Sequence, residues 1–267
     1  MDSNKVWIDL MQRITNEGEV CAPRGKVIKE IINASYTIDM QSPVITNQAR
    51  KMAYGFMFGE AAWIVSGSNW LSAIAYHMKR YADFSDDGVF LNGAYGPKVA
   101  EQYTYVVNTL LNDPDSRQAV IGIWRERPAS SKDIPCTLTM QFFIRGGNLH
   151  SVVNMRSQDA VWGFSYDIFT FSQVANMVRV LLLNQGVAVQ LGSLHVQVGS
   201  AHIYEHHFND VPVWTACTQT DDRAAARAKD LANFVGSPHE LINRLEEYAN
   251  EFRNWPSCVS FEVWFLW

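Results

Sequence analysis

Three kinds of side chain follow one another along the chain in an order that suits nucleophilic catalysis. Cys136 comes first, Arg156 and Ser157 follow, and Asp167 lies after a glycine at the head of an apolar segment. A thiolate is a strong nucleophile near neutral pH, and the forked N–H groups of arginine bind anions. A carboxyl in apolar surroundings can recognise polar atoms of a ligand. The order therefore predicts a nucleophile, an anion-binding group and a recognition group in one site.

Glu60 is a candidate acid or base in an earlier part of the chain. It lies in an apolar segment beside Ala61, Ala62 and Trp63, where desolvation would raise the pKa of its carboxyl toward a range useful for proton transfer. The alternative is a glutamate on a solvated helix face. Arg24 lies in a loop with proline and glycine and is a candidate anion contact, and its alternative is a solvated loop arginine.

The hydrophobic pattern predicts the elements that must position these residues. The segment 168–183 is apolar with little charge and predicts a long buried helix. Segments 141–144 and 149–155 flank the turn sequence Arg145-Gly146-Gly147-Asn148 and predict a β-hairpin. We also expect helices at 6–17, 47–65, 70–81, 99–111, 223–229 and 240–252, strands within 27–45 and at 119–124, and a strand pair over 191–204. The apolar segment 261–267 is expected to pack on the rest of the protein.

Composition limits the class of protein. The chain has 267 residues, 48% of them hydrophobic, which is enough for a large core, and neither a linker nor an internal repeat divides it. We therefore expect one domain over residues 1–267. The net charge of -5 argues against nucleic acid as the main ligand. A small anionic ligand needs only a local group of arginines, so the charge does not exclude one.

The sequence also indicates whether the protein crosses a membrane, forms disulfides or binds a metal. The sequence has neither an apolar run long enough to cross a membrane nor a signal peptide, so we expect a soluble cytoplasmic protein without a membrane partner. Four cysteines lie far apart without a Cys-x-x-Cys pair, which predicts reduced thiols: Cys21, Cys136, Cys217 and Cys258. One polar cluster could suggest zinc, but it lacks an H-E-x-x-H pattern or a cysteine partner, and no metal is expected: His202, Glu205, His206 and His207.

Six short motifs, taken in order, resemble those of the thymidylate synthase superfamily, which includes the pyrimidine hydroxymethylases. They are Glu60 ahead of Ser66-Gly67-Ser68-Asn69, Asn112-Asp113-Pro114-Asp115-Ser116-Arg117, Pro135-Cys136, Arg156-Ser157-x-Asp159, Gly163-x-x-Tyr166-Asp167-Ile168 and His202-Ile203-Tyr204. The resemblance extends from about residue 20 to residue 208. It implies an α/β (α+β) thymidylate-synthase-like fold, with a large mixed sheet flanked by helices and a long buried central helix. It also implies an obligate homodimer.

The resemblance implies roles for the reacting and anion-binding residues. Cys136 would be the nucleophile that adds to C6 of a pyrimidine, and Glu60 would position water and move protons. Arg24, Arg156 and Ser157 would bind the nucleotide phosphate, together with an arginine donated across the dimer interface, which is Arg117 of the other subunit. The family usually has a second arginine after that one, and Gln118 stands there in this sequence.

Further contacts implied by the resemblance concern the base, the sugar and the co-substrate. His202 and Tyr204 would hold the sugar 3′-hydroxyl, and Tyr95 would lie close to the nucleophile. The co-substrate would be 5,10-methylenetetrahydrofolate, contacted by Asp159 and Trp70. For Asp159 the alternative is a side chain that only caps a helix or a turn.

The identity of the base depends on one departure from the family. Thymidylate synthases have asparagine at the position of Asp167, which offers a donor and an acceptor to O4 and N3–H of uracil. An ionised Asp167 cannot donate to O4, but it can accept from the 4-amino group of cytosine, and a shared proton can serve N3. The substitution predicts dCMP as the substrate, as in the deoxycytidylate hydroxymethylases of some bacteriophages. A phage-encoded chain would act in the host cytoplasm. The alternative is that Asp167 only caps a helix starting at Ile168.

Two other departures favour hydroxymethyl over methyl transfer. Thr137 replaces a histidine that commonly follows the nucleophile, and Met155 replaces the usual glutamine before the arginine, which suggests a site less sealed against water. Three alternatives stay open: a CMP hydroxymethylase, a thymidylate synthase or dUMP hydroxymethylase that tolerates Asp167, and a catalytically silent nucleotide-binding protein. The presence of both Cys136 and Glu60 argues against the silent protein.

Overall fold

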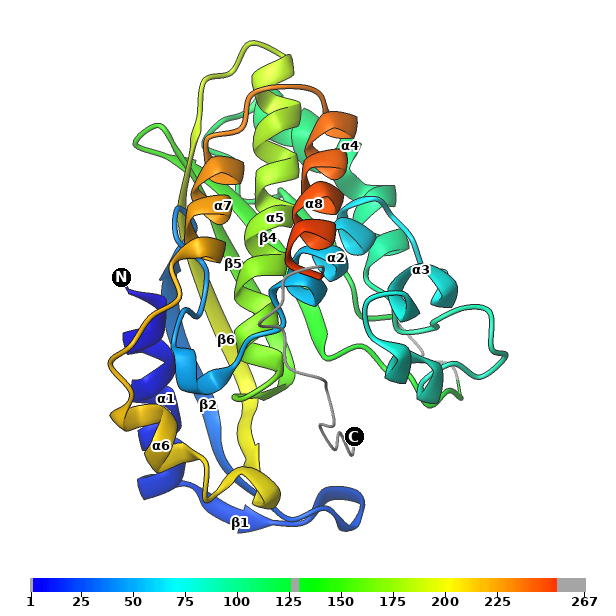
Figure 1. The fold of residues 1–267 in the computed structure, drawn as a ribbon. Coiled ribbons are helices and arrows are strands. Elements are labelled where there is room, and N and C mark those ends of the chain that lie inside the picture. Colours follow the sequence, from blue (N-terminus) through cyan, green and yellow to red (C-terminus); the bar gives the residue numbers. More distant parts are fainter. Residues whose placement is uncertain (1, 126–129, 254–267) are drawn as a thin grey trace.

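The protein is a mixed six-stranded sheet with helices across one face, as seen in a computed structural model that describes residues 2–125 and 130–253 (Figure 1). The strand order is β1-β2-β6-β5-β4-β3, and only the β5–β6 pair is parallel. The strands are β1 (Glu19–Cys21), β2 (Ile28–Asp39), β3 (Val120–Gly122), β4 (Thr137–Arg145), β5 (Asn148–Asp159) and β6 (Gln190–Tyr204). The predicted mixed sheet flanked by helices is confirmed.

Helix α5 (Gly163–Asn184) is the predicted long central helix. Most of its residues, apolar and polar, are buried between β5 and β6 on one side and the neighbouring helices on the other. Figure 1 shows it running along the sheet, with α7 (Arg223–Ala232) and α8 (Pro238–Arg253) beside it. The remaining α-helices are α1 (Ser3–Glu17), α2 (Tyr54–Val65), α3 (Leu71–Ala75), α4 (Gly96–Asn112) and α6 (Val211–Ala216).

Local chemistry explains where several elements begin and turn. Gly146 and Gly147 both have positive φ in the tight β4–β5 hairpin, which is the conformation that this turn requires. Ser237 and Glu240 form a reciprocal capping box at the start of α8, with Ser237 N donating to Glu240 Oε2 over 2.7 Å. The hairpin turn and the start of α8 therefore both follow from the residue types at these positions.

Three predicted elements differ from the structure. The helix expected at 47–65 starts only at Tyr54, because the Asn47 side chain accepts from Arg50 N and Lys51 adopts a left-handed conformation, which ends a short 3-10 turn. The helix expected at 70–81 is interrupted, because Met78 is extended between α3 and a second 3-10 turn. The strand pair expected over 191–204 is one strand, β6, paired with β2 and β5. The segment 261–267 and Cys258 lie outside the described residues.

Strand β6 contains a glycine, Gly199, at a point where it lies close to the backbone of β5. A Cβ at this position would lie 2.7 Å from the backbone oxygen of Arg156 on β5, so the glycine permits close approach rather than a turn.

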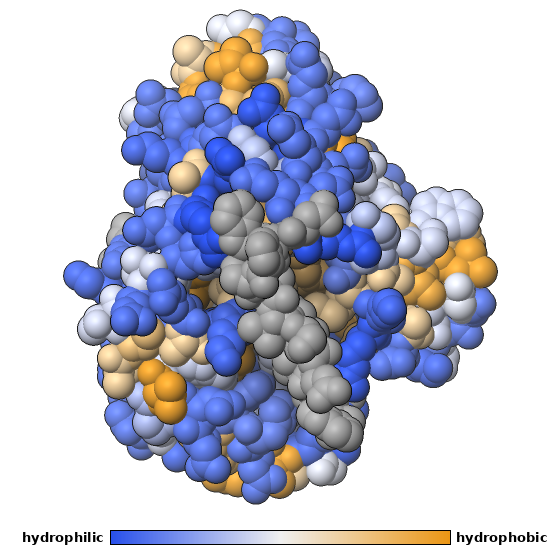
Figure 2. All heavy atoms as spheres, viewed as in Figure 1, coloured by the Kyte–Doolittle hydropathy of each residue, from blue (hydrophilic) through white to orange (hydrophobic). Residues whose placement is uncertain are grey.

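The face of the molecule seen in Figure 2 is covered mainly by hydrophilic residues, with apolar residues in small separate patches. Within residues 2–125 and 130–253, no helix combines the length and apolar content that crossing a membrane requires.

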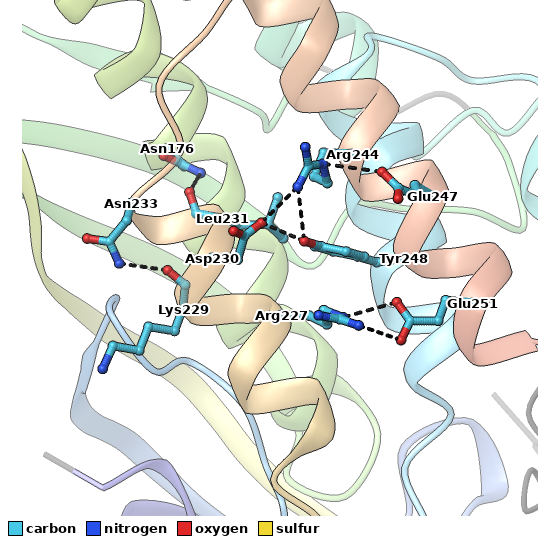
Figure 3. Close-up of polar contacts among 10 residues, drawn as sticks. All are labelled: Asn176, Arg227, Lys229, Asp230, Leu231, Asn233, Arg244, Glu247, Tyr248 and Glu251. Atoms are coloured by element: carbon cyan, nitrogen blue, oxygen red, sulfur yellow. Dashed lines mark hydrogen bonds and ion pairs between the residues drawn. The ribbon is translucent and has the colours of Figure 1, made fainter.

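Polar contacts join α7 to α5 and α7 to α8 (Figure 3). The buried Asn176 side chain of α5 donates to the Leu231 carbonyl over 2.8 Å and accepts from Arg179 Nε over 2.9 Å. At the surface, Arg227 and Glu251 form a two-bond ion pair between α7 and α8. Because α8 also packs against α2, these contacts help to set the position of the helix that carries Glu60.

We predict that Asn176→Ala lowers the free energy of unfolding by about 2–4 kcal/mol, because it opens a cavity and leaves buried polar groups without partners. The matched control is Asn233→Ala, which removes an exposed asparagine that donates to Lys229 O at the end of α7. That change should cost less than about 1 kcal/mol. Urea denaturation of both variants measures the difference, and equal costs would contradict the assigned role of Asn176.

Candidate active site

A cavity of about 790 Å³ lies beside the first turns of α5 and the ends of β5 and β6. Residues from α2, from the loops before α4 and β4, and from the loop before β2 complete its wall. Ten of the predicted site residues line it: Arg24, Glu60, Tyr95, Cys136, Arg156, Ser157, Asp159, Asp167, His202 and Tyr204. These residues come from distant parts of the sequence, and the fold brings them to one hollow.

Cys136 lies directly before β4, and its carbonyl accepts a hydrogen bond from Arg156 N over 2.9 Å. Burial raises the pKa of the Cys136 thiol, while the charges of Arg156 and Arg24 oppose that rise and the carboxyls of Asp167 and Asp133 add to it. The two arginines therefore lower the pKa of the thiol, but they do not outweigh burial and the nearby carboxyls, and the net shift is upward. Desolvation of the thiolate is the larger effect.

Two arginines reach this side of the cavity. The Arg156 guanidinium donates from Nε to Pro135 O over 2.9 Å and from Nη2 to Ile134 O over 3.0 Å, which fixes its plane beside the cysteine. Arg24 has a left-handed backbone conformation, with φ of 55°, in the turn before β2. Such a conformation is uncommon for a residue with a side chain and recurs at functional sites.

Glu60 is held inside the cavity by Tyr81, whose hydroxyl donates to Glu60 Oε1. Burial raises the pKa of the Glu60 carboxyl to about 7, against the lowering effect of that hydrogen bond. The sequence-based expectation of a raised pKa is thus confirmed. A carboxyl that titrates near neutral pH can both accept and release a proton during turnover.

Asp167 lies in the second turn of α5, because that helix begins at Gly163 rather than at Ile168. Its Oδ2 accepts a hydrogen bond from Gln158 Nε2 over 2.7 Å. The alternative that Asp167 caps the helix is therefore excluded. Burial raises the pKa of the Asp167 carboxyl to about 8, the hydrogen bond from Gln158 lowers it, and the Glu60 charge adds to the rise. At neutral pH the carboxyl is mainly protonated.

His202, Tyr204 and Asp159 lie together where β5 and β6 end. Asp159 and His202 are register partners in the parallel pair, and the rings of His202 and Tyr204 meet edge to face at 5.2 Å. Asp159 Oδ1 accepts from Val161 N over 2.8 Å, so this side chain does make the turn contact that was its alternative. It also lines the cavity, so the turn contact is compatible with the predicted contact to a ligand.

Two predicted site residues do not line the cavity of a single chain. Trp70 is 53% exposed, and its ring packs on Phe90 at 4.5 Å. Trp63 and Trp162 line the cavity instead. Arg117 is exposed before β3, and its carbonyl accepts from Gln141 Nε2. Its predicted role needs a second subunit and stays a prediction.

Sequence reasoning missed the residues that hold the two carboxyls, Tyr81 and Gln158. Gln158 is the unspecified position inside Arg156-Ser157-x-Asp159, so the motif did not mark it. Nothing in the sequence marked Tyr81, because it reaches Glu60 only after the chain folds back from α3. Trp162 was also missed, although it directly precedes the motif that begins at Gly163.

The histidine cluster has a structural explanation. His207 Nε2 accepts from Trp162 Nε1 over 3.0 Å, and its Nδ1 contacts Asp210 Oδ2 over 3.0 Å. Both ring nitrogens are thus engaged in hydrogen bonds. Among the described residues, no group of three or more histidine, cysteine, aspartate or glutamate side chains is arranged to hold a metal ion. Cys21, Cys136 and Cys217 are free thiols.

The chain belongs to the thymidylate synthase family, whose family profile matches residues 5–226. It is 30% identical to the deoxyuridylate hydroxymethyltransferase of Bacillus phage SP01, over 93% of this chain and 71% of that protein. It is 26% identical to the deoxyuridylate hydroxymethyltransferase of Pseudomonas phage M6, over 77% of this chain and 61% of that protein. The chain thus spans less than two thirds of the Pseudomonas phage protein.

We predict that Asp167→Asn raises the melting temperature at pH 8 and has little effect at pH 4. The folded-state pKa of Asp167, about 8, lies above the ordinary value, so the folded protein binds this proton more tightly than the unfolded chain. Its contribution to stability is full at low pH and is lost as pH rises toward 8. The neutral amide of asparagine avoids that loss of unfolding free energy. A loss of about 1 kcal/mol or more corresponds to a change of roughly 2–4 °C or more in the melting temperature. Calorimetry at both pH values measures it, and an equal shift at both would refute this assignment.

Proposed function

We propose that this protein transfers a one-carbon unit from 5,10-methylenetetrahydrofolate to C5 of dCMP and adds water, giving 5-hydroxymethyl-dCMP. Membership of the thymidylate synthase family supports folate-dependent one-carbon transfer to a pyrimidine nucleotide. The observation that carries the proposal is that one cavity contains the Cys136 thiol, the Glu60 and Asp167 carboxyls, whose pKa values are raised, and the guanidinium groups of Arg24 and Arg156. A binding protein without catalysis would not need both buried carboxyls, whose burial costs stability as pH rises from their ordinary pKa values toward 7 and 8.

The reaction would begin when the Cys136 thiolate forms a bond to C6 of the base. The electron pair then moves to C5, which bonds to the methylene carbon of the folate as one of that carbon's two C–N bonds breaks, and C5 loses its proton. Departure of tetrahydrofolate leaves a methylene group on C5. The oxygen of a water molecule adds to that carbon, and the sulfur leaves C6. Glu60 would position this water and accept or return its proton.

The anion and sugar contacts follow from the residues around the cavity. Arg24, Arg156 and Ser157 would bind the phosphate, since a guanidinium suits two parallel hydrogen bonds to phosphate oxygens. His202 and Tyr204 would hold the sugar 3′-hydroxyl. Tyr95, whose pKa is raised first by burial and then by Cys136 and Asp167, would lie beside the reacting carbon.

Folate would lie against the aromatic part of the wall. Trp63, Trp162 and Tyr166 line the cavity and offer flat apolar surfaces to a pterin ring. Asp159 would provide a polar contact. We propose Trp63 and Trp162 for the aromatic contact that the sequence had suggested for Trp70, because Trp70 is outside this wall.

A homodimer completes the site in this proposal. The face of the sheet that carries Ile32, His195 and Gln197 is exposed in one chain, and Ile32 is 72% exposed. A second copy on this face would cover Ile32, and Arg117 would be donated across the interface. Neither nucleic acid nor a metal has a part in this mechanism, and the proposed place of action is the host cytoplasm.

The choice of dCMP depends on the carboxyl of Asp167. A protonated carboxyl has one donor and one acceptor, so it can pair with the N3 and N4 atoms of cytosine or with the N3 and O4 atoms of uracil. The ring nitrogen of cytosine is the more basic acceptor and can share the carboxyl proton, which gives a stronger hydrogen bond than O4 does. This favours dCMP more weakly than a permanently ionised carboxyl would.

A dUMP hydroxymethylase is the second candidate, because the two phage relatives carry the name deoxyuridylate hydroxymethyltransferase. The reaction steps would be the same, and the proton of Asp167 would then point to O4. Mass spectrometry of the products from dCMP, CMP and dUMP, each incubated with methylenetetrahydrofolate, separates the candidates. A gain of CH₂O on dCMP supports the proposal, and a gain of CH₂ shows methyl transfer instead.

We predict that Cys136→Ser reduces turnover by at least about 10³-fold while nucleotide binding persists, because a serine hydroxyl is a much weaker nucleophile than a thiolate. Product formation is followed by mass spectrometry and binding by calorimetry. The control is Cys217→Ser, which changes a free thiol that does not line the cavity. Full turnover by Cys136→Ser would eliminate the covalent mechanism.

We predict that Asp167→Asn shifts the preference from dCMP toward dUMP by at least tenfold, or about 1.4 kcal/mol. The amide keeps one donor and one acceptor, but it cannot share a proton with N3 of cytosine. The ratio of kcat/KM for the two nucleotides measures the shift. An unchanged ratio would contradict the proposed role of Asp167 in choosing the base.

A further inference from the structure

A chain of hydrogen bonds leads from outside the cavity to the recognition carboxyl. The Tyr36 hydroxyl of β2 donates to Gln158 Oε1 over 2.7 Å, and Gln158 Nε2 donates to Asp167 Oδ2 over 2.7 Å. Tyr36 does not line the cavity, whereas Gln158 and Asp167 do. Three elements, β2, β5 and α5, therefore contribute one side chain each to a single line of donors and acceptors.

The packing around Gln158 leaves its amide little freedom. The side chain is 2% exposed, and its Nε2 also lies 3.3 Å from Met155 Sδ. Gly163 allows the head of α5 to approach, because a Cβ there would lie 3.2 Å from Gln158 Cγ and 3.4 Å from Asp167 Oδ2. The Tyr36 ring packs on the buried Phe164 with centroids 4.7 Å apart. The amide oxygen thus faces Tyr36, and the amide nitrogen faces Asp167.

This orientation distinguishes the two oxygens of Asp167. An oxygen that accepts an N–H bond is favoured as the carbonyl-type oxygen of a protonated carboxyl, so the proton is favoured on the other oxygen. A base that pairs with Asp167 would therefore meet a fixed donor at Oδ1 and a fixed acceptor at Oδ2. Cytosine and uracil present donor and acceptor in opposite order at N3 and the 4-position, so a fixed order on the protein selects between them.

We propose that Gln158, oriented by Tyr36, is a positioning residue that fixes the donor and acceptor order of Asp167 and thereby sets the choice between cytosine and uracil nucleotides. This inference rests on the proposed function of the same cavity. It assigns to Gln158 and Tyr36 a part in specificity without contact between Tyr36 and the nucleotide. Without the amide donor, both carboxyl oxygens could carry the proton, and either base could pair.

Other ionisable groups also face Asp167 and must be separated from it in a pH experiment. They come from α2, from the end of β5, from β2, and from the residues just before β4 and α4: Glu60, Asp159, Tyr36, Cys136 and Tyr95. Asp167→Asn identifies the contribution of Asp167, because any pH dependence that this variant keeps belongs to the other groups.

The experiment measures dissociation constants of dCMP and dUMP, without folate, from pH 6 to pH 10. The variants are Gln158→Met, which keeps the length of the side chain but loses the N–H donor, and Tyr36→Phe, which loses one hydroxyl. The controls are Gln41→Met, whose amide donates to Leu191 O, and Tyr105→Phe, whose hydroxyl donates to Gln118 O. Neither control residue lines the cavity.

We expect the dCMP/dUMP affinity ratio to move toward unity by at least tenfold in Gln158→Met and by about threefold in Tyr36→Phe. The midpoint assigned to Asp167 should move to higher pH in Gln158→Met, since the lost hydrogen bond had stabilised the ionised carboxyl. The two control variants should keep the ratio and the midpoint of the unaltered protein. Because Tyr36→Phe removes only one oxygen atom, it keeps the test valid even if Gln158→Met does not fold.

An unchanged ratio in the folded variants overturns the inference, and so does a midpoint that moves to lower pH, because the carboxyl would then donate to Gln158. Failure of the proposed function is separate. If the unaltered protein binds neither nucleotide, that function is wrong. If the unaltered protein prefers dUMP, only its substrate is wrong, and the same movement of the ratio toward unity still supports the role of Gln158.

Discussion

The burial of α5 is the constraint on which the site depends. This helix lies between the sheet and a layer of helices, so the polar side chains at its head must find partners away from bulk water. Asp167 has one such partner, Gln158, but burial raises the pKa of its carboxyl to about 8 against that hydrogen bond, so the carboxyl is mainly neutral near physiological pH. A neutral carboxyl at the edge of the cavity can donate as well as accept. Burial thus changes the chemistry that this residue type would have in water.

The same balance between desolvation and local charge applies to the thiol and to Glu60. Arg156 and Arg24 favour the thiolate of Cys136, but burial and the nearby carboxyls outweigh them. A nucleotide phosphate would neutralise part of the arginine charge, so activation of the thiol would depend on the groups around the base as well. The pKa of the Glu60 carboxyl is about 7, because burial raises it and the hydrogen bond from the Tyr81 hydroxyl lowers it.

Much of the site could be predicted from the sequence because its residues belong to short motifs with fixed spacing. Cys136, Arg156, Asp167 and His202 are each in such a motif, and all four line the cavity. The helix boundary before Asp167 could not be placed, because Gly163 is a weak helix former that the tertiary structure accepts for close packing. Predicting helix from residue 47 to 65 failed because side-chain capping by Asn47 competes with the helix.

By itself, the sequence predicted the cysteine and the arginines that line the cavity, the hairpin with two glycines and the long apolar helix, since these predictions depend on motifs, residue type and local periodicity. Only the tertiary structure decided which groups surround each carboxyl. Tyr36, Tyr81 and Gln158 are ordinary polar residues in sequence, and they act on Glu60 and Asp167 only because distant segments meet. The pKa of a buried group depends on every neighbour within a few ångströms, and those neighbours come from several elements. Hydrogen-bond partners that are distant in the sequence leave no local pattern in it. The protonation state of Asp167 could therefore be inferred only from the structure.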